Sequence, residues 1–129
     1  KLQSFYRICS AESANGINWE NTGNVLIDCD EKISNFARPW VIYFKGIFHL
    51  FYSYASPGVP YQIGCSTSKD FKKWDRNDNI TSLNSLKSKE ESNMMCYPSL
   101  FQYKSTLFLF YNGNNFGKKG ILMATCELT

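Results

Sequence analysis

The side chains in this sequence that could act on a ligand are aromatic rings, amides and one guanidinium group. The candidate set for substrate binding is Arg38, Trp40, Tyr97, Asn93, Asn112 and Asn114, with Tyr54, Glu90 and Glu91 as additional candidates. Flat apolar rings stack on sugars, while planar amides and guanidinium groups hydrogen-bond to neighbouring hydroxyls. The set therefore predicts a carbohydrate-binding surface. For Trp40 and Tyr97, packing between neighbouring elements is an equally good interpretation.

Carboxylates suited to glycosidic chemistry are harder to find. Hydrolysis of a glycosidic bond ordinarily needs two of them, about 5 Å apart for retention and further apart for inversion. Glu90 and Glu91 follow a Ser- and Lys-rich stretch at 85–89, so we expect both to be solvated loop charges. The acidic segment 28–31 is expected to be solvated as well. No residue is therefore assigned a catalytic role.

Other reaction chemistries find little support in the sequence. His49 is the single histidine, and an isolated histidine on a strand is expected to be packed or solvent-facing. Without a histidine cluster we predict no metal site, and we expect no cofactor. A Ser/His/Asp arrangement is not indicated either, because the G-x-S-x-G motif is absent.

The five cysteines are Cys9, Cys29, Cys65, Cys96 and Cys126. They are odd in number, far apart and without a C-x-x-C pair, which argues against a zinc site and against a disulfide framework. We therefore expect reduced thiols and a cytoplasmic location. Cys96 lacks an obvious base and is expected to be a small buried hydrophobe. The chain starts with Lys1 and shows no signal-peptide pattern.

Composition sets further bounds on function. A chain of 129 residues with 43% hydrophobic and 16% aromatic content can bury a core. The net charge of +3 is spread along the chain, so no basic stripe points to nucleic acid. The apolar runs are far shorter than the roughly 20 residues of a membrane-spanning helix, so we expect no membrane insertion.

The sequence contains an internal repeat of two modules. The segment 38–53 recurs at 97–112 with an offset of 59 residues and no gap. The segment 6–19 recurs at 61–74 with an offset of 55, and an unfinished third copy lies at 120–125. Periods in the fifties suit propeller blades, whose repeats run from about 40 to 50 residues or slightly more.

Each module is rich in β-branched and aromatic residues between turn signals, which predicts strands. Tight hairpin turns are expected at 45–46 and 104–105. The chain 1–129 is therefore predicted to be all-β, a partial propeller of about two and a quarter four-stranded antiparallel blades. In this prediction residues 5–27 supply the outer strands of one blade, 38–78 a full blade and 96–127 three strands of the next.

Nine strands cannot close a ring by themselves, because propellers have at least four blades of four strands. Open sheet edges favour aggregation, so we expect either a longer chain or further copies to complete the ring. Two copies would give eighteen strands, close to the roughly twenty of a five-bladed ring. A β-sandwich of nine antiparallel strands is the alternative fold, although the immunoglobulin Cys…Trp…Cys spacing is absent.

Two turn segments resemble a known superfamily. Residues 13–19 (SANGINW) and 68–74 (SKDFKKW) resemble the S-x-D-G-x-x-W signature of five-bladed glycoside hydrolase propellers, the superfamily of arabinanases, β-xylosidases and invertases. Segments 48–52 (FHLFY) and 108–111 (FLFY) are similar to its Y-H-L-F-Y strand. These motifs specify the blade and not the reaction.

Three further segments, 37–40 (ARPW), 96–98 (CYP) and 111–118 (YNGNNFGK), resemble glycosidase-like propellers associated with bacterial surface-polysaccharide synthesis. This resemblance implies an acid just ahead of Cys96, where the chain has Asn93. The implied function is a glycoside hydrolase-like protein acting on a poly- or oligosaccharide. The missing acid leaves two alternatives, a non-catalytic carbohydrate-binding or assembly module and an inactive truncated fragment.

The predicted site lies at one rim of the blades. Because strand direction alternates, this rim carries the loops 53–60, 75–95 and 112–119, whereas the other rim carries short turns. Long loops on one face mark a binding face. We expect Arg38 to be a buried charge beside the central channel, where it would need a partner.

Overall fold

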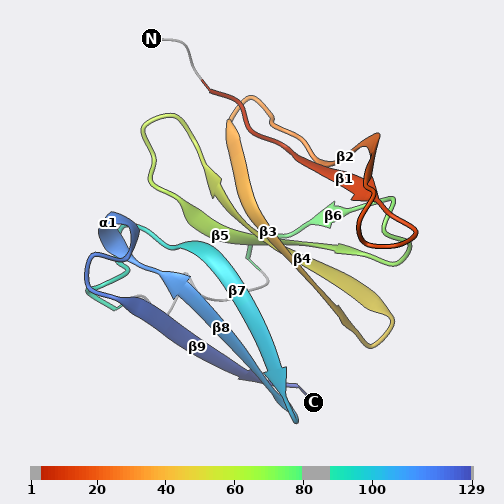
Figure 1. Cartoon of the computed structure of the whole chain (residues 1–129). Helices are drawn as coiled ribbons and strands as arrows, with labels where there is room; N and C mark the ends of the chain where they lie inside the picture. Colours follow the sequence, from red (N-terminus) through yellow and green to blue (C-terminus); the bar gives the residue numbers. More distant parts are fainter. Residues whose placement is uncertain (1–3, 80–87, 129) are drawn as a thin grey trace.

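The computed structural model describes residues 4–79 and 88–128, and these residues form antiparallel sheets (Figure 1). A two-stranded sheet holds β1 (Ile8–Glu12) and β2 (Glu20–Ile27). A four-stranded sheet holds β3 (Asn35–Phe44), β4 (Ile47–Ala55), β5 (Gln62–Ser68) and β6 (Asp75–Arg76). A three-stranded sheet holds β7 (Cys96–Tyr103), β8 (Thr106–Asn112) and β9 (Ile121–Glu127), with helix α1 (Asn114–Gly117) between the last two. None of the helical structure in these ranges is long and apolar enough to cross a membrane.

Each sheet is a meander whose strands pair in sequence order, as propeller blades do. The predicted all-β, partial propeller is therefore confirmed, and the sandwich alternative is set aside. We call the sheets blade 1 (β1 and β2), blade 2 (β3 to β6) and blade 3 (β7 to β9). Figure 1 shows blade 2 between the other two. The first strands of blades 2 and 3, β3 and β7, contact each other.

Alternation along β4 gives blade 2 two buried faces. Successive residues of a strand point to opposite sides of the sheet. Leu50 therefore faces blade 1 and packs in a cluster with Ile8, while its neighbour Phe51 faces blade 3 and packs against a cluster that contains Leu100. Blade 2 thus packs against blade 1 on one face and against blade 3 on the other.

A polar network ties the outer edge of blade 2 to its centre. The Tyr52 hydroxyl donates to Asp78 Oδ1 at 2.8 Å and lies 3.1 Å from Ser66 Oγ. Arg76 Nε donates to Asp78 Oδ2 at 2.7 Å. Gly64 leaves room for this network, because a Cβ at its position would clash with Asp78 Oδ1.

The two S-x-D-G-x-x-W-like segments close turns in the same way. Asn15 Oδ1 accepts two backbone N–H groups at 2.9 Å, and Asp70 Oδ1 accepts two at 2.8 and 2.9 Å. The indoles of Trp19 and Trp74 each donate to a backbone carbonyl at 3.2 Å. These side chains satisfy the turn backbone, so the motif has an architectural role here.

The hairpin turns and the long loops lie at opposite ends of the blades. Lys45 and Gly46, with φ of 48° and 79°, form the predicted tight turn between β3 and β4. In Figure 1 this turn and the turn between β7 and β8 lie at one end, and the loop between β4 and β5 lies with α1 at the other. The loop-bearing end is the rim on which the sequence places the site.

The face of blade 3 that points away from blade 2 is apolar and exposed. We call it the trailing face, and its exposed large side chains are Phe101, Tyr103, Phe110, Ile121 and Met123. In the repeat, Phe101 and Phe110 correspond to Ile42 and Phe51 of blade 2, which pack against blade 3. The same surface is therefore covered in blade 2 and open in blade 3.

Candidate functional site

Arg38 and Tyr97 occupy equivalent positions in β-bulges of neighbouring blades. The pairing of β3 with β4 slips between Ala37 and Trp40, and that of β7 with β8 slips between Cys96 and Ser99. Both residues have left-handed backbone conformations, with φ of 54° and 60°. Bulges re-aim side chains at sheet ends, and the two re-aimed side chains meet across the blades.

The two bulge residues are part of a cluster of aromatic rings. The Arg38 guanidinium carbon lies 5.3 Å from the centroid of the Tyr97 ring. Tyr97 stacks on Phe116 at 6.0 Å and 30°, and Phe116 meets Tyr61 edge to face at 6.4 Å. We call Arg38, Tyr61, Tyr97 and Phe116 the rim cluster. It joins β3, the loop before β5, β7 and α1.

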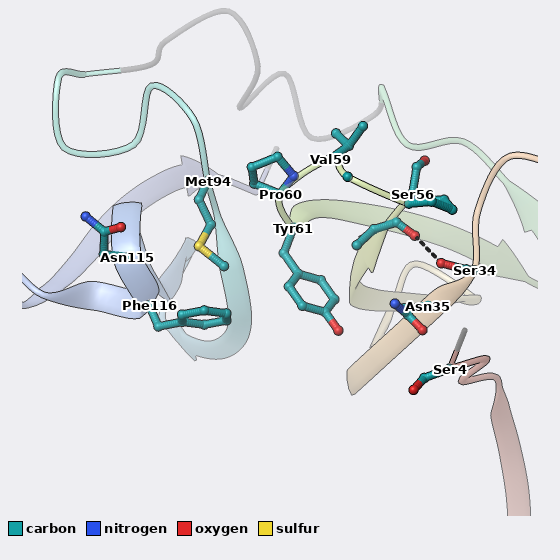
Figure 2. A pocket seen from close by; sticks show the side chains of 13 residues that line it. Ser4, Ser34, Asn35, Ser56, Val59, Pro60, Tyr61, Met94, Asn115 and Phe116 are labelled. Atoms are coloured by element: carbon teal, nitrogen blue, oxygen red, sulfur yellow. Dashed lines mark hydrogen bonds between the residues drawn. The ribbon is translucent and has the colours of Figure 1, made fainter. Parts of the chain in front are cut away.

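Two members of the rim cluster, Tyr61 and Phe116, line a pocket of about 650 Å³. Figure 2 shows Tyr61 and Phe116 on its wall, with Met94, Asn35 and Ser34 from the adjoining segments. The lining is completed by the loop residues Ala55, Ser56, Pro57, Gly58, Val59 and Pro60, by Asn115 and by Ser4. Three of these segments belong to the predicted rim loops, so the structure brings the loops together at one place.

Two of the predicted residues, Arg38 and Tyr54, lie differently from what the sequence suggested, and Trp40 keeps both of its interpretations. Arg38 is exposed within the described residues, so the expectation of a buried charge is wrong there. Trp40 is 41% exposed and stays a candidate for either packing or binding. Tyr54 packs against the cluster between blades 1 and 2, and Arg76 lies over its ring at 5.4 Å.

The three predicted asparagines have different surroundings. Asn114 Oδ1 accepts the backbone N–H groups of Asn93 and Met94 at 3.0 Å, and its Nδ2 donates to the Lys89 carbonyl at 3.1 Å. Asn112 Nδ2 donates to the Phe116 carbonyl at 3.1 Å. These amides hold the loops that carry the rim cluster. The side chain of Asn93 is exposed, and its position as a ligand contact stays a prediction.

The expectation that Glu91 is solvated is wrong. Its side chain is 7% exposed, accepts a hydrogen bond from the Tyr111 hydroxyl and accepts another from the Ser88 backbone at 2.9 Å. A buried carboxylate is tolerated when donors surround it. Glu90 is exposed, as predicted, and its carbonyl accepts the Asn114 backbone N–H at 2.7 Å.

The pair formed by Tyr111 and Glu91 gives a first prediction. We expect Tyr111→Phe to lower the free energy of unfolding at pH 7 by about 2 kcal/mol, because the buried carboxylate loses a donor. Burial, and then the hydrogen bond to Glu91, raise the pKa of Tyr111 above its usual value of about 10. The stabilisation is therefore complete below pH 10 and is lost as the pH rises further.

Urea unfolding of both proteins at pH 7 and pH 11 measures this effect. The variant should lose less stability between the two pH values than the parent. Tyr43→Phe, at a 62% exposed tyrosine, is the matched control and should change stability by only a few tenths of a kcal/mol. Equal unfolding midpoints for Tyr111→Phe and the parent would contradict the role given to the pair.

The acidic residues of the segment 28–31 are held by local contacts. Asp30 accepts the backbone N–H groups of Lys32 and Ile33 at 2.7 Å and pairs with Arg76 at 3.3 Å. The backbone hydrogen bonds lead in holding its pKa below the usual range. Asp28 pairs with Arg7 at 3.7 Å. Among the residues that line the pocket in the described chain, there is no Asp or Glu.

The remaining reactive side chains are the cysteines, of which Cys65 and Cys96 are buried, and His49. Cys96 is fully buried, and desolvation raises the pKa of its thiol to about 11, so the prediction of a small buried hydrophobe is confirmed. All five cysteines are described, and all are free. His49 is half-buried, and its Nδ1 is buried without a hydrogen-bond partner. No cluster of three metal-ligating side chains occurs within residues 4–79 and 88–128.

Sequence reasoning did not single out Tyr61 and Phe116. Tyr61 lies in a repeated segment, and Phe116 lies in the segment 111–118 that carries the resemblance, but neither segment predicts that the two rings meet. Phe116 has φ of 56° within the loop that holds α1, and this unusual backbone turns its ring toward Tyr97. The run of Asn and Gly residues around Phe116 was the available signal, since such residues permit tight turns.

No protein-family model matches the chain. Two relatives from Mycobacterium tuberculosis, Uncharacterized protein Rv1502 of strain H37Rv and Uncharacterized protein MT1551 of strain CDC 1551, are each 28% identical over 118 residues. The matches cover 91% of this chain and 39% of each relative. The chain therefore spans about two fifths of the length of these relatives.

Three solved structures share the arrangement of strands. The BT0996 complex with RGII has a TM-score of 0.71 at 17% identity, and the match covers 94% of this chain and 36% of BT0996. A glycoside hydrolase has a TM-score of 0.67 at 17% identity, over 92% and 35%. A Bombyx mori GH32 β-fructofuranosidase in complex with sucrose has a TM-score of 0.60 at 18% identity, over 89% and 25%. The chain thus has a glycosidase-like fold, and it covers about a third or less of each of these proteins.

Proposed function

We propose that this chain is part of a glycoside hydrolase-like, five-bladed propeller that acts on a poly- or oligosaccharide, and that the rim cluster is where it contacts the sugar. One observation carries the proposal. An arginine and three aromatic rings from separate elements converge on the loop-bearing rim, and two of the rings, Tyr61 and Phe116, line a pocket there. Sugar sites combine apolar ring faces with planar hydrogen-bonding groups in this way.

The proposal assigns binding to this chain and leaves the bond-breaking carboxylates to the rest of the ring. Glu91 is engaged with Tyr111, and Asp30 with Arg76. Since the curated relatives are longer, further blades or a further copy of the chain would supply the two acids that glycoside hydrolysis needs. A non-catalytic carbohydrate-binding module is the alternative, and a complete ring without facing carboxylates at its channel would favour it.

Saccharide binding can be measured by saturation-transfer NMR on the chain with arabinan, xylan and fructan oligosaccharides. We expect Phe116→Ala to weaken binding about tenfold, because it removes an exposed ring from the cluster. Phe101→Ala is the matched control, since Phe101 is 59% exposed but lies on the trailing face. If Phe116→Ala binds the saccharide with unchanged affinity, the sugar does not contact the rim cluster.

A second candidate function is assembly, and the trailing face favours it. We propose that a second copy of the chain packs on this face to complete the ring. The repeat supports this, because the corresponding face of blade 2 is covered by a neighbouring blade. Twice the nine described strands is eighteen, against about twenty in a five-bladed propeller.

Light scattering on the purified chain tests the assembly proposal. We expect a dimer, and we expect Phe110→Glu to shift it to a monomer, because the substitution places a charge on an apolar contact. Glu20→Gln, on the exposed edge of blade 1, should leave the mass unchanged. A parent chain that is monomeric at all concentrations would mean that a segment of a longer protein, and not a second copy, covers the trailing face.

A further inference from the structure

Arg38 differs from the other arginines of the chain in its partners. All three arginines lie in the described residues. Arg7 pairs with Asp28, and Arg76 pairs with Asp78 and Asp30. The guanidinium of Arg38 makes no ion pair or hydrogen bond within the described chain, where its contact is the ring of Tyr97. Its five N–H donors are therefore available to a ligand.

The position of this guanidinium is fixed by the structure around it. Tyr97, on which it lies, donates its backbone N–H to the buried Ser53 Oγ at 2.8 Å, and its ring also stacks on Phe116. A guanidinium that lies over an aromatic ring keeps the N–H groups at its edge exposed. Because the contact already restricts the side chain, binding a ligand costs less conformational entropy. The contact with Tyr97 therefore orients the Arg38 guanidinium before a ligand binds.

The charges around Arg38 also favour an anion. Lys118 and Lys119 follow Phe116 by two and three residues and are exposed. Of the exposed carboxylates in the segment before β3, Asp28 and Asp30 are paired with Arg7 and Arg76. Glu31 and Glu90 are also exposed, but no Asp or Glu of the described residues lines the pocket. Guanidinium groups match the geometry of carboxylates and phosphates and bind them through paired, charge-assisted hydrogen bonds.

From this arrangement we infer that the saccharide bound at the rim cluster carries a negative group, a carboxylate or a phosphate, which pairs with Arg38 while the sugar ring lies against Phe116 and Tyr61. The inference rests on the proposed function and adds the class of ligand. A neutral sugar would leave the cation without a counter-charge. An anionic sugar satisfies both the guanidinium and the rings.

The test uses ¹⁵N-resolved NMR titration of the chain, because the Arg38 Nε–H and the Tyr97 amide report separately on the two halves of the site. The probes are D-glucuronate, D-glucose, glucose 6-phosphate and inorganic phosphate. We expect an anionic sugar to bind at least about tenfold more tightly than glucose, with the preference falling as salt is added. Arg38→Gln should abolish this preference, Arg38→Lys should retain part of it, and Arg7→Gln, at an exposed arginine of blade 1, should leave it unchanged.

The possible results distinguish failure of the anionic-ligand inference from failure of the proposed saccharide binding. Equal binding of glucose and glucuronate, both unaffected by Arg38→Gln, would overturn the anionic ligand and leave saccharide binding intact. Binding of inorganic phosphate at Arg38, without any sugar perturbing Tyr97, would overturn the saccharide part and reveal a simple anion site. If no probe perturbs either residue, both proposals fail. Glucuronate and glucose 6-phosphate, compared with each other, distinguish a carboxylate from a phosphate ligand.

Discussion

Phe36→Ala is expected to lower the free energy of unfolding by about 4 kcal/mol. Phe36 is 2% exposed and packs edge to face against Tyr52 at 5.3 Å, in the cluster that joins blades 1 and 2. Arg76 also lies over its ring, at 5.0 Å. Removing a buried phenyl ring loses the transfer energy of its carbons and leaves a cavity, which typically costs about 3 to 5 kcal/mol.

Urea unfolding followed by circular dichroism measures this loss, and Phe101→Ala is the matched control. Phe101 is also a phenylalanine on the first strand of its blade, but its side chain is exposed on the trailing face. Both losses are measured in the Phe110→Glu background, where the chain is expected to be monomeric, and there the control should cost less than about 1 kcal/mol. A loss of similar size in the two variants would mean that the trailing face is covered in solution. A loss below about 1 kcal/mol in Phe36→Ala would contradict the packing of blade 1 on blade 2.

Gly64→Ala is expected to cost about 3 kcal/mol, although it adds a single methyl group. The new Cβ would clash with Asp78 Oδ1 and stand 2.6 Å from a ring carbon of Tyr52. Overpacking of this kind typically costs about 1 to 3 kcal/mol, and here it also displaces the two partners of a part-buried hydrogen bond, Tyr52 and Asp78. The backbone of Gly64 does not have a positive φ, so the loss reflects the clash rather than strain.

A double-mutant cycle identifies the cause of the Gly64 effect. In an Asp78→Ala background the carboxylate is gone, so Gly64→Ala should cost clearly less than it does in the parent chain. Additive losses in the two variants would show that the clash with Asp78 is not the source. Arg76 belongs to the same network, and its ion pair with Asp30 joins blade 2 to the segment after blade 1.

Local sequence determined the strands and turns of this protein. Segments rich in β-branched and aromatic residues predicted β4 and β8, and the turn residues at 45–46 and 104–105 predicted the hairpins that the structure contains. The two S-x-D-G-x-x-W-like segments closed as expected because their hydrogen bonds link residues two or three positions apart. These features depend on neighbours in the chain, so the chain itself reveals them.

The sequence named Arg38 and Tyr97 as candidates, and tertiary structure decided that they join Phe116 and Tyr61 in one cluster. Arg38, Tyr97, Phe116 and Tyr61 come from four separate segments, and their contacts depend on how blade 3 packs on blade 2. Glu91 looked like one charge of a solvated run, but the packing of its loop on β8 placed it beside the Tyr111 hydroxyl. Burial and contacts between blades are set by non-local packing, which a local pattern of charges and rings does not encode.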